Sequence, residues 1–287
     1  MAQISVGQMK LNVTPLTPIL GAEIEGIDLS LPIDESSFKM ISTALVEHAV
    51  IIFHEQQLTP KSQINFSRRF CPLMTHVLKD ALLENFPEIY RLSNIKQKGK
   101  SQGRAYAGQY WHSDLTYEET PSLGSVLYSI DVPKCGGDTL FSSTAHAFET
   151  LSAPMQHMLE GLTAEHLFAH AFRDSMNSAA RKGDRLNDRP PVSHPVVRTH
   201  PESGRKCLFI NEGFTVRINE MEQSESMHLL KFLYAHMTKP EMVYRHKWRT
   251  GDVVIWDNRS LVHRGVSDYG DEQPRYMHRT TIKDTSN

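Results

Sequence analysis

The sequence has no long hydrophobic run. Its longest purely apolar stretch is Ala49–Phe53, far short of the roughly 18 or more residues that a membrane-spanning helix needs. Residues 1–10 also lack the basic start and the apolar core of a secretory signal peptide. We therefore expect a cytoplasmic protein with no membrane partner.

Cysteine is scarce, and neither sign of charge dominates. The three cysteines, Cys71, Cys135 and Cys207, are an odd number with no repeated spacing, which argues against a disulfide framework. Lysine and arginine total 31 against 33 acidic residues, a net charge of −2. The overall charge therefore gives no indication of a nucleic acid or anionic membrane partner.

The remaining composition is that of an ordinary globular protein. Apolar residues make up 39% of the 287 residues and charged residues 22%, enough apolar side chains for a sizeable core. No stretch resembles a linker, so we expect one domain over residues 1–287.

Alternation and turn residues predict a mainly β protein with flanking helices. A strand or hairpin at the sheet edge is expected in 17–28. Further strands are expected at Ala49–Phe53, at Ser125–Ile130 paired with Asp138–Phe141, in 196–201 and 207–214, and at Met242–Trp248, Val253–Asp257 and Arg275–Ile282. Helices are expected around Phe38, Ile41 and Leu45, after Thr59-Pro60, at 152–162 with Met155 and Met158 inward, and at Gln223–Met237 with Met227, Leu230, Phe232, Leu233 and Met237 inward. The polar stretch 93–108 is predicted to be a mobile loop, either a lid over a site or a solvated surface loop.

The candidate chemistry begins at Trp111-His112-Ser113-Asp114. In an extended segment residues two apart share a face, so His112 and Asp114 can present an imidazole and a carboxylate to one ion. His263, 149 residues after Asp114 (263 − 114), is a candidate third ligand. Two histidines and one carboxylate leave three positions of an octahedron open, as in non-haem Fe(II) oxygenases. A His-X-Asp triplet alone is common by chance, so the surrounding motifs must decide whether it is a metal site.

That context resembles a known family. The order Trp111-His112-Ser113-Asp114, Gly136-Gly137-Asp138-Thr139, Trp256-Asp257-Asn258-Arg259, His263 and Arg275-Tyr276-Met277-His278-Arg279 resembles the taurine dioxygenase family of Fe(II)- and 2-oxoglutarate-dependent oxygenases, which includes alkyl-sulfate and aryloxyalkanoate dioxygenases. The resemblance extends from Leu16 to Thr281. It implies a double-stranded β-helix (jelly-roll) barrel, and Fe(II), 2-oxoglutarate and O2 as cofactor and co-substrates. It also implies a homo-oligomer, since members are commonly dimers or tetramers.

The resemblance also implies roles for individual residues. His112, Asp114 and His263 would hold iron, and Thr139 and Arg275 would bind the far carboxylate of 2-oxoglutarate. His76 and Arg279 would hold the anionic group of the substrate, with Phe172 and Phe214 as walls of its pocket. Arg275, Met277 and Arg279 share one face of a strand by period two, which gives either two anion sites in one pocket or two solvated arginines.

The implied reaction is hydroxylation of a small anionic molecule, a sulfonate, a sulfate ester or an aryloxyalkanoate or other carboxylate, with succinate and CO2 as co-products. A hydroxylated carbon that bears such a leaving group would then collapse to a carbonyl compound. The stretch Ala107-Gly108-Gln109 lacks the asparagine of taurine-cleaving members, which puts taurine itself in doubt. Two alternatives stay open on the same fold: a Zn-dependent hydrolase or isomerase, and a non-catalytic binding protein.

Overall fold

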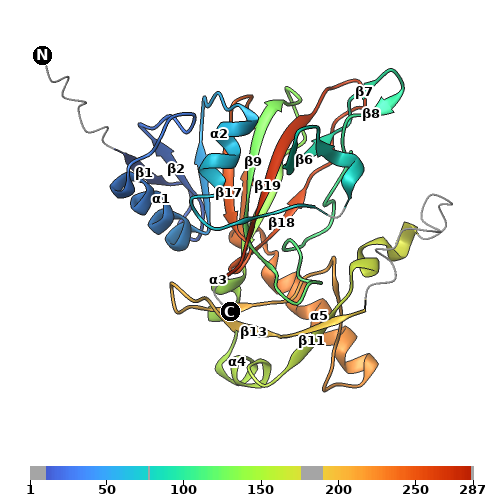
Figure 1. Ribbon diagram of the computed structural model, residues 1–287. Helices are drawn as coiled ribbons and strands as arrows, with labels where there is room; N and C mark the ends of the chain where they lie inside the picture. The colour runs from blue at the N-terminus through green and yellow to red at the C-terminus, as the bar shows by residue number, and fades with distance from the viewer. Residues whose placement is uncertain (1–10, 77, 176–189, 286–287) are drawn as a thin grey trace, which may run out of the picture.

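The computed structural model describes residues 11–76, 78–175 and 190–285, except the side chains of residue 100 and residues 172–175. The protein is mainly β, as predicted. Its largest sheet fills the upper part of the molecule in Figure 1. This sheet has nine strands, in the order β1 (Asn12–Pro15), β2 (Ala22–Glu25), β3 (Val50–Phe53), β17 (Val253–Asp257), β9 (Ser122–Asp131), β19 (Tyr276–Lys283), β6 (Phe86–Ser93) and β5 (Leu82–Leu83), with β4 (Leu73–Met74) paired to β19.

The other strands form four smaller sheets. They are β16 (Val243–His246), β10 (Thr139–Ser143) and β18 (Leu261–Gly265); β12 (Val192–Pro195), β11 (Thr163–His166) and β15 (Thr215–Ile218); β13 (Val197–Thr199) and β14 (Lys206–Leu208); and β7 (Lys96–Gln97) and β8 (Lys100–Ser101). Within the described ranges, hydrogen bonds do not close any sheet into a barrel.

The helices flank the sheets. They are α1 (Glu35–His48), α2 (Pro60–Ser67), α3 (Thr144–Glu149), α4 (Ala153–Leu159), α5 (Gln223–Met237) and the 3-10 helices η1 (Lys79–Ala81), η2 (Phe168–Ser175) and η4 (Pro240–Met242). The side chain of Asp34 caps α1 by accepting from the amide of Ser37, and Thr59 caps α2, as the sequence predicts. No helix within the described residues is long and apolar enough to span a bilayer.

One apolar core lies between the nine-stranded sheet and the β16-β10-β18 sheet. It combines Trp256 and Val254 of β17 with Phe141 of β10, Leu261 of β18 and Met277 of β19. Both β10 and β18 are therefore held against the face of β17, β9 and β19 by apolar burial. This packing brings β18 and β19 to one pocket, which His263 and Arg279 line.

The structure corrects several sequence-based expectations. Strands β9 and β10 exist but do not pair with each other: β9 lies between β17 and β19, and β10 lies between β16 and β18. The turn Pro133–Gly137 carries the chain from one sheet to the other instead of closing a hairpin. The stretch 93–108 is not loop throughout, since it contains the β7-β8 hairpin.

Two further corrections concern exposure on helices. Met158 of α4 and Met227 and Phe232 of α5 are exposed rather than buried. Phe232 follows the buried Leu230 by two residues, about 200° around the helix, and so points to solvent. The other predicted inward residues of α5, Leu233 and Met237, are buried.

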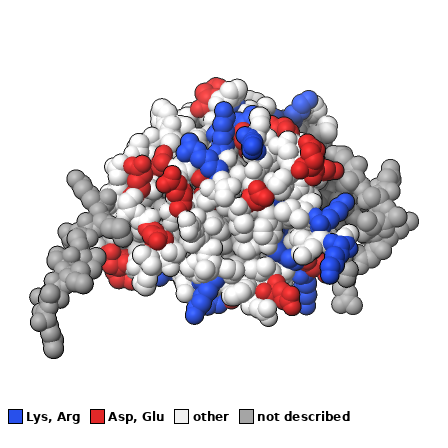
Figure 2. Space-filling model, turned by 90° about the horizontal axis from the view of Figure 1, so that it is seen from above, with Lys and Arg blue, Asp and Glu red and all other residues white. Residues whose placement is uncertain are grey.

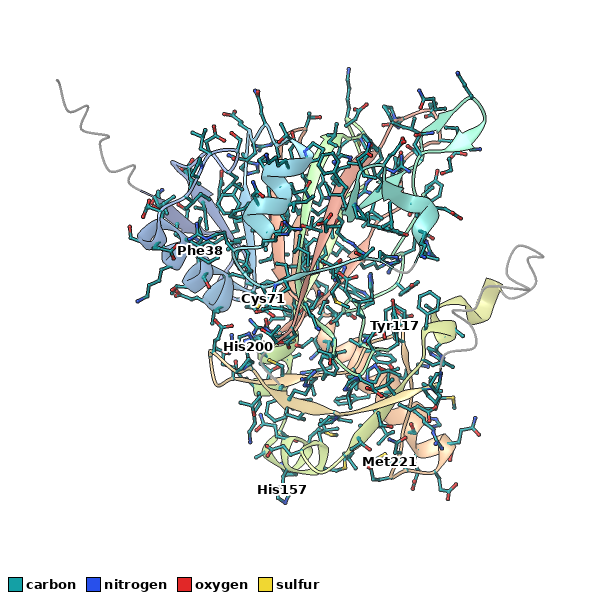
Figure 3. All side chains as sticks on the ribbon, viewed as in Figure 1. Phe38, Cys71, Tyr117, His157, His200 and Met221 are labelled. Atoms are coloured by element: carbon teal, nitrogen blue, oxygen red, sulfur yellow. The ribbon has the colours of Figure 1, made fainter. Side chains whose placement is uncertain are left out.

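The molecular surface carries both signs of charge. Figure 2 shows basic and acidic side chains interspersed over the face seen from above. In Figure 3, Tyr117 and His200 lie inside the molecule between its upper and lower parts, whereas His157 points outward from α4.

Candidate metal centre and pocket

The structure brings His112, Asp114 and His263 together. One ligand atom from each of these buried residues lies within 4.8 Å of the others, and they form the one such histidine and carboxylate group found in the described part of the chain. The Nε2 atom of His112 lies 3.8 Å from Oδ1 of Asp114, and Nε2 of His263 lies 4.0 Å from Oδ2. Both imidazoles therefore turn the same nitrogen toward one carboxylate.

The main chain sets this geometry. The amide of His112 donates to the carbonyl of His263 (2.9 Å), and the amide of His263 donates back to the carbonyl of His112 (2.7 Å). His263 lies in the middle of β18. The predicted extended segment ends early, because a turn begins at Asp114 and Leu115 has φ 61°. A two-bond bridge thus fixes the spacing of the two imidazoles.

Burial and charge give these groups the protonation states that metal ligands need. Burial lowers the pKa of His112, although the charge of Asp114 acts in the opposite direction. The pKa of His263 lies well below its usual value, mainly because of burial and also because of the nearby His112. Burial would raise the pKa of Asp114, but Arg279 and the two histidines outweigh it and hold that pKa below its usual range. Two neutral imidazoles and an ionised carboxylate are the set that binds a divalent cation.

The surrounding hydrogen bonds orient the ligands. Nδ1 of His112 is 2.9 Å from the carbonyl oxygen of Tyr110, which makes Nδ1 the donor and leaves the Nε2 lone pair for a metal. Ser125 donates to Oδ2 of Asp114 (2.9 Å), and Nη1 of Arg279 donates to Oδ1 (3.1 Å). Nδ1 of His263 is buried without a partner among the described residues. These residues fit a divalent metal with His112, Asp114 and His263 as its ligands.

Asn258 holds the main chain of Asp114, and no motif in the sequence indicated this role. Its side-chain oxygen accepts from the amide of Asp114 (3.2 Å) and from the indole of Trp256 (3.0 Å), and its nitrogen donates to Ser122 (2.8 Å). Its place in the motif Trp256-Asp257-Asn258-Arg259 was the available signal. The motif does not show that this amide reaches across to Asp114.

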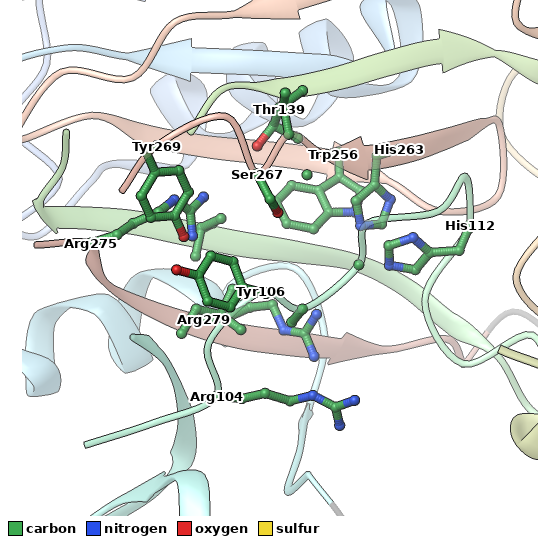
Figure 4. A pocket seen from close by; sticks show the side chains of 16 residues that line it. Arg104, Tyr106, His112, Thr139, Trp256, His263, Ser267, Tyr269, Arg275 and Arg279 are labelled. Carbon is green, nitrogen blue, oxygen red and sulfur yellow. The ribbon is translucent and has the colours of Figure 1, made fainter. Parts of the chain in front are cut away.

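A pocket extends from the histidines to Arg275. Figure 4 shows His112 and His263 at one end of this pocket and Arg275 beside Tyr269 at the other, with Thr139 along its wall. Burial lowers the pKa of Arg275, and no carboxylate acts on that pKa within the described residues. Thr139 Oγ1 accepts from the indole of Trp248 (3.0 Å), so its own hydroxyl proton can point into the pocket.

A second pocket meets the first at His112 and Arg279, and it contains three of the predicted substrate residues. His76, Arg279 and Phe214 line it. The His76 ring stacks on Tyr90 with centroids 4.1 Å apart, and its Nδ1 accepts from the amide of Leu78 (3.1 Å). The fourth predicted residue, Phe172, lies outside the described side chains. Tyr90 and Arg104 line this pocket as well, and no sequence motif indicated a role for them.

Comparisons with known proteins point to the same kind of enzyme site as the geometry does. Residues 12–281 match the family model described as "Taurine catabolism dioxygenase TauD, TfdA family". The chain is 35% identical to an alpha-ketoglutarate-dependent 2,4-dichlorophenoxyacetate dioxygenase of Cupriavidus pinatubonensis, with 96% of this chain and 99% of the relative covered. It is also 35% identical to an alkylsulfatase of Acinetobacter baylyi, with 95% and 85% covered. A crystal structure of a taurine dioxygenase from Burkholderia xenovorans superposes with a TM-score of 0.80 at 32% identity, covering 95% and 90%.

Proposed function

Because this chain belongs to the TauD/TfdA family, we propose that it oxidises a small anionic organic substrate at the pocket between His112 and Arg279. It is an Fe(II)- and 2-oxoglutarate-dependent dioxygenase. The observation that carries the proposed site is the convergence of His112, Asp114 and His263 at the junction of two pockets. The relatives give no support to the alternatives of a zinc hydrolase or a binding protein.

We propose that His112, Asp114 and His263 are the iron ligands. Support comes from the buried, hydrogen-bonded arrangement and from the depressed pKa values of the two histidines. When bound, iron together with 2-oxoglutarate and O2 supplies the oxidising chemistry, in which 2-oxoglutarate becomes succinate and CO2 and a substrate C–H becomes C–OH. The protein's own contribution is to hold the ligands, orient both acids and keep water out.

Arg275 and Thr139 are the proposed partners of the far carboxylate of 2-oxoglutarate. A guanidinium binds a carboxylate through two parallel N–H donors, and a hydroxyl adds a third. Arg275 is suited to this role because it is half-buried at the far end of the pocket, where an anion would compensate its charge.

Arg279 and His76 are the proposed partners of the substrate's anionic group, with Phe214 as an apolar wall. The assignment of Phe172 as a second wall stays a prediction. If the hydroxylated carbon carries a sulfonate, sulfate ester or aryloxy group, the adduct loses sulfite, sulfate or a phenol and leaves a carbonyl compound. The relatives' names include sulfate ester and phenoxypropionate dioxygenases, which fits this range.

We further propose that the fold is a double-stranded β-helix in one domain. The apolar core between the nine-stranded sheet and the β16-β10-β18 sheet supports this, as does the family match over residues 12–281. The homo-oligomer, the lid role of 93–108 and the cytoplasmic location stay predictions.

The test combines a spectrum with kinetics. Anaerobic addition of 2-oxoglutarate to the Fe(II) protein should produce a weak visible absorption band in the wild type and none in His112→Ala. Arg275→Ala should raise the KM for 2-oxoglutarate far more than the KM for the substrate, and Arg279→Ala should do the reverse. Equal effects of the two changes on both constants would refute the assignment of the arginines.

A further inference from the structure

We propose that Arg104 is a second substrate-binding arginine, and that Arg104 and Arg279 together select a substrate whose anionic group has three terminal oxygens, a sulfonate or a sulfate ester. This inference rests on the proposed function and deepens it. It assigns a role to a residue of the 93–108 segment and chooses among the three substrate classes.

The backbone of Arg104 is fixed against β6. Its amide donates to the carbonyl of Arg91 (3.0 Å), and its carbonyl accepts from the amide of Ser93 (3.1 Å). Gly103 permits this approach, because a Cβ atom there would lie 2.6 Å from the Arg91 carbonyl oxygen. Arg104 is therefore positioned by a strand, although it lies in a segment that was predicted to be a mobile loop.

The side chain of Arg104 reaches the substrate side of the site. Arg104 lines both pockets, as do Arg279 and His112. In Figure 4 the guanidinium groups of Arg104 and Arg279 point toward the same side of the pocket, that of His112. Two cationic side chains, Arg279 from β19 and Arg104 from the segment bridged to β6, thus meet the space beside the proposed iron ligands.

Tyr90 connects the two arginines. Burial raises the pKa of Tyr90, while the charges of Arg104 and Arg279 and a hydrogen bond from Arg104 oppose that rise. The Arg279 guanidinium carbon lies 5.2 Å from the centre of the Tyr90 ring. Tyr90 also lines this pocket, and its hydroxyl can donate a proton to an anion there.

The pocket offers more hydrogen-bond donors than one guanidinium edge, which is enough to bind a carboxylate. Arg279 gives Nη1 to Asp114, while its Nε is buried without a partner among the described residues. That remaining edge of one guanidinium suits the two oxygens of a carboxylate. Arg104 and Tyr90 add a second set of donors to the same pocket, and the third terminal oxygen of a sulfonate or sulfate ester would use them in addition to the two oxygens held by Arg279. Asp114 is the one carboxylate among the described lining residues of this pocket, against the two arginines Arg104 and Arg279, so the charge balance of the lining favours an anion.

Arg104→Gln tests the proposal with a panel of hexyl sulfate, hexanesulfonate and phenoxyacetate. Lys96→Gln is the matched control, because it removes the same charge from an exposed position of the same segment without touching either pocket. In Arg104→Gln the KM for the best sulfate or sulfonate should rise at least about tenfold, as expected for loss of one charged hydrogen-bond partner. The KM for 2-oxoglutarate should change less than about threefold.

Binding should follow the same pattern without turnover. Anaerobic calorimetric titration of the Fe(II) and 2-oxoglutarate protein with hexanesulfonate should show weaker binding in Arg104→Gln, partial rescue in Arg104→Lys and a smaller loss in Tyr90→Phe. Wild-type preference for phenoxyacetate would overturn the proposal. An equal loss for phenoxyacetate and the sulfur acids, an equal rise in both KM values, or no change would also overturn it. Absence of the 2-oxoglutarate-dependent band in the wild type would instead show that the proposed function itself has failed.

Discussion

Gly108 offers a sharp test of how the metal centre is held. Its φ is +69°, and a Cβ atom added there would lie 2.6 Å from Cε1 and 3.2 Å from Nε2 of His112. The imidazole cannot simply turn away, because Nδ1 is held by the Tyr110 carbonyl and the ring packs 4.1 Å from that of His263. Gly108→Ala should therefore displace the ring of His112 from its position beside Asp114.

The size of the effect can be worked out against a control. A side chain in the left-handed region costs about 1–2 kcal/mol, and Gly204→Ala carries the same φ of +69° with nothing within 4 Å of the added Cβ. This strain should lower the free energy of unfolding of both variants. Only Gly108→Ala should also lose metal affinity, by roughly 10–100-fold, as when other groups that orient a ligand are disturbed. At a metal concentration 100 times the wild-type Kd, stabilisation by metal is about 2.7 kcal/mol and should fall to about 0.4–1.4 kcal/mol.

The assay is urea unfolding with and without Mn²⁺, which stands in for Fe(II) and does not oxidise in air. The difference between the two curves measures stabilisation by metal for the wild type, Gly108→Ala and Gly204→Ala. The reasoning fails if Gly108→Ala keeps the full metal-dependent stabilisation, or if Gly204→Ala loses it to the same extent.

Three further predictions concern groups around the site. Trp248→Phe removes the donor to Thr139 and should raise the KM for 2-oxoglutarate roughly 3–10-fold at little-changed kcat; an unchanged KM in steady-state kinetics would contradict the role of that bond. Asn258→Ala strands the buried amide of Asp114 along with an indole donor and should cost about 2–5 kcal/mol in urea unfolding. Burial lowers the pKa of His166 to about 3. Below pH 6.5, therefore, His166 binds a proton in the unfolded chain but stays neutral in the folded chain. The free energy of unfolding should fall by up to about 1.4 kcal/mol per pH unit from pH 6.5 toward 3, and His166→Asn should remove that part of the slope.

Much of the fold and the candidate site followed from residue patterns. A short apolar run gave β3, and helical spacing gave α5, almost to the residue. Helical spacing and candidate caps also indicated where α1 and α2 lie, but not their full extents. The family motifs indicated the three metal-centre residues, which the structure brings together.

What the sequence missed depends on contacts between distant segments. The pairing of β9 with β10 was wrong because neighbouring strands in a chain need not be neighbours in a sheet, and only the packed core decides which sheet each joins. Asn258 and Arg104 were missed because a motif or a polar loop does not say where a side chain points. Their partners, Asp114 and Tyr90, lie 144 and 14 (104 − 90) residues away in the sequence.

The bridge between His112 and His263 also determines when the metal centre can form during translation. After His112 a ribosome adds 150 residues (262 − 112) before it adds His263, and β18 must then pair with the main chain at His112, which has already been made. A nascent chain can therefore collapse around its early strands without yet holding the metal centre. Iron capture should be one of the last events in maturation, and a ribosome stalled before residue 263 should carry a partly folded chain that binds no iron at this site.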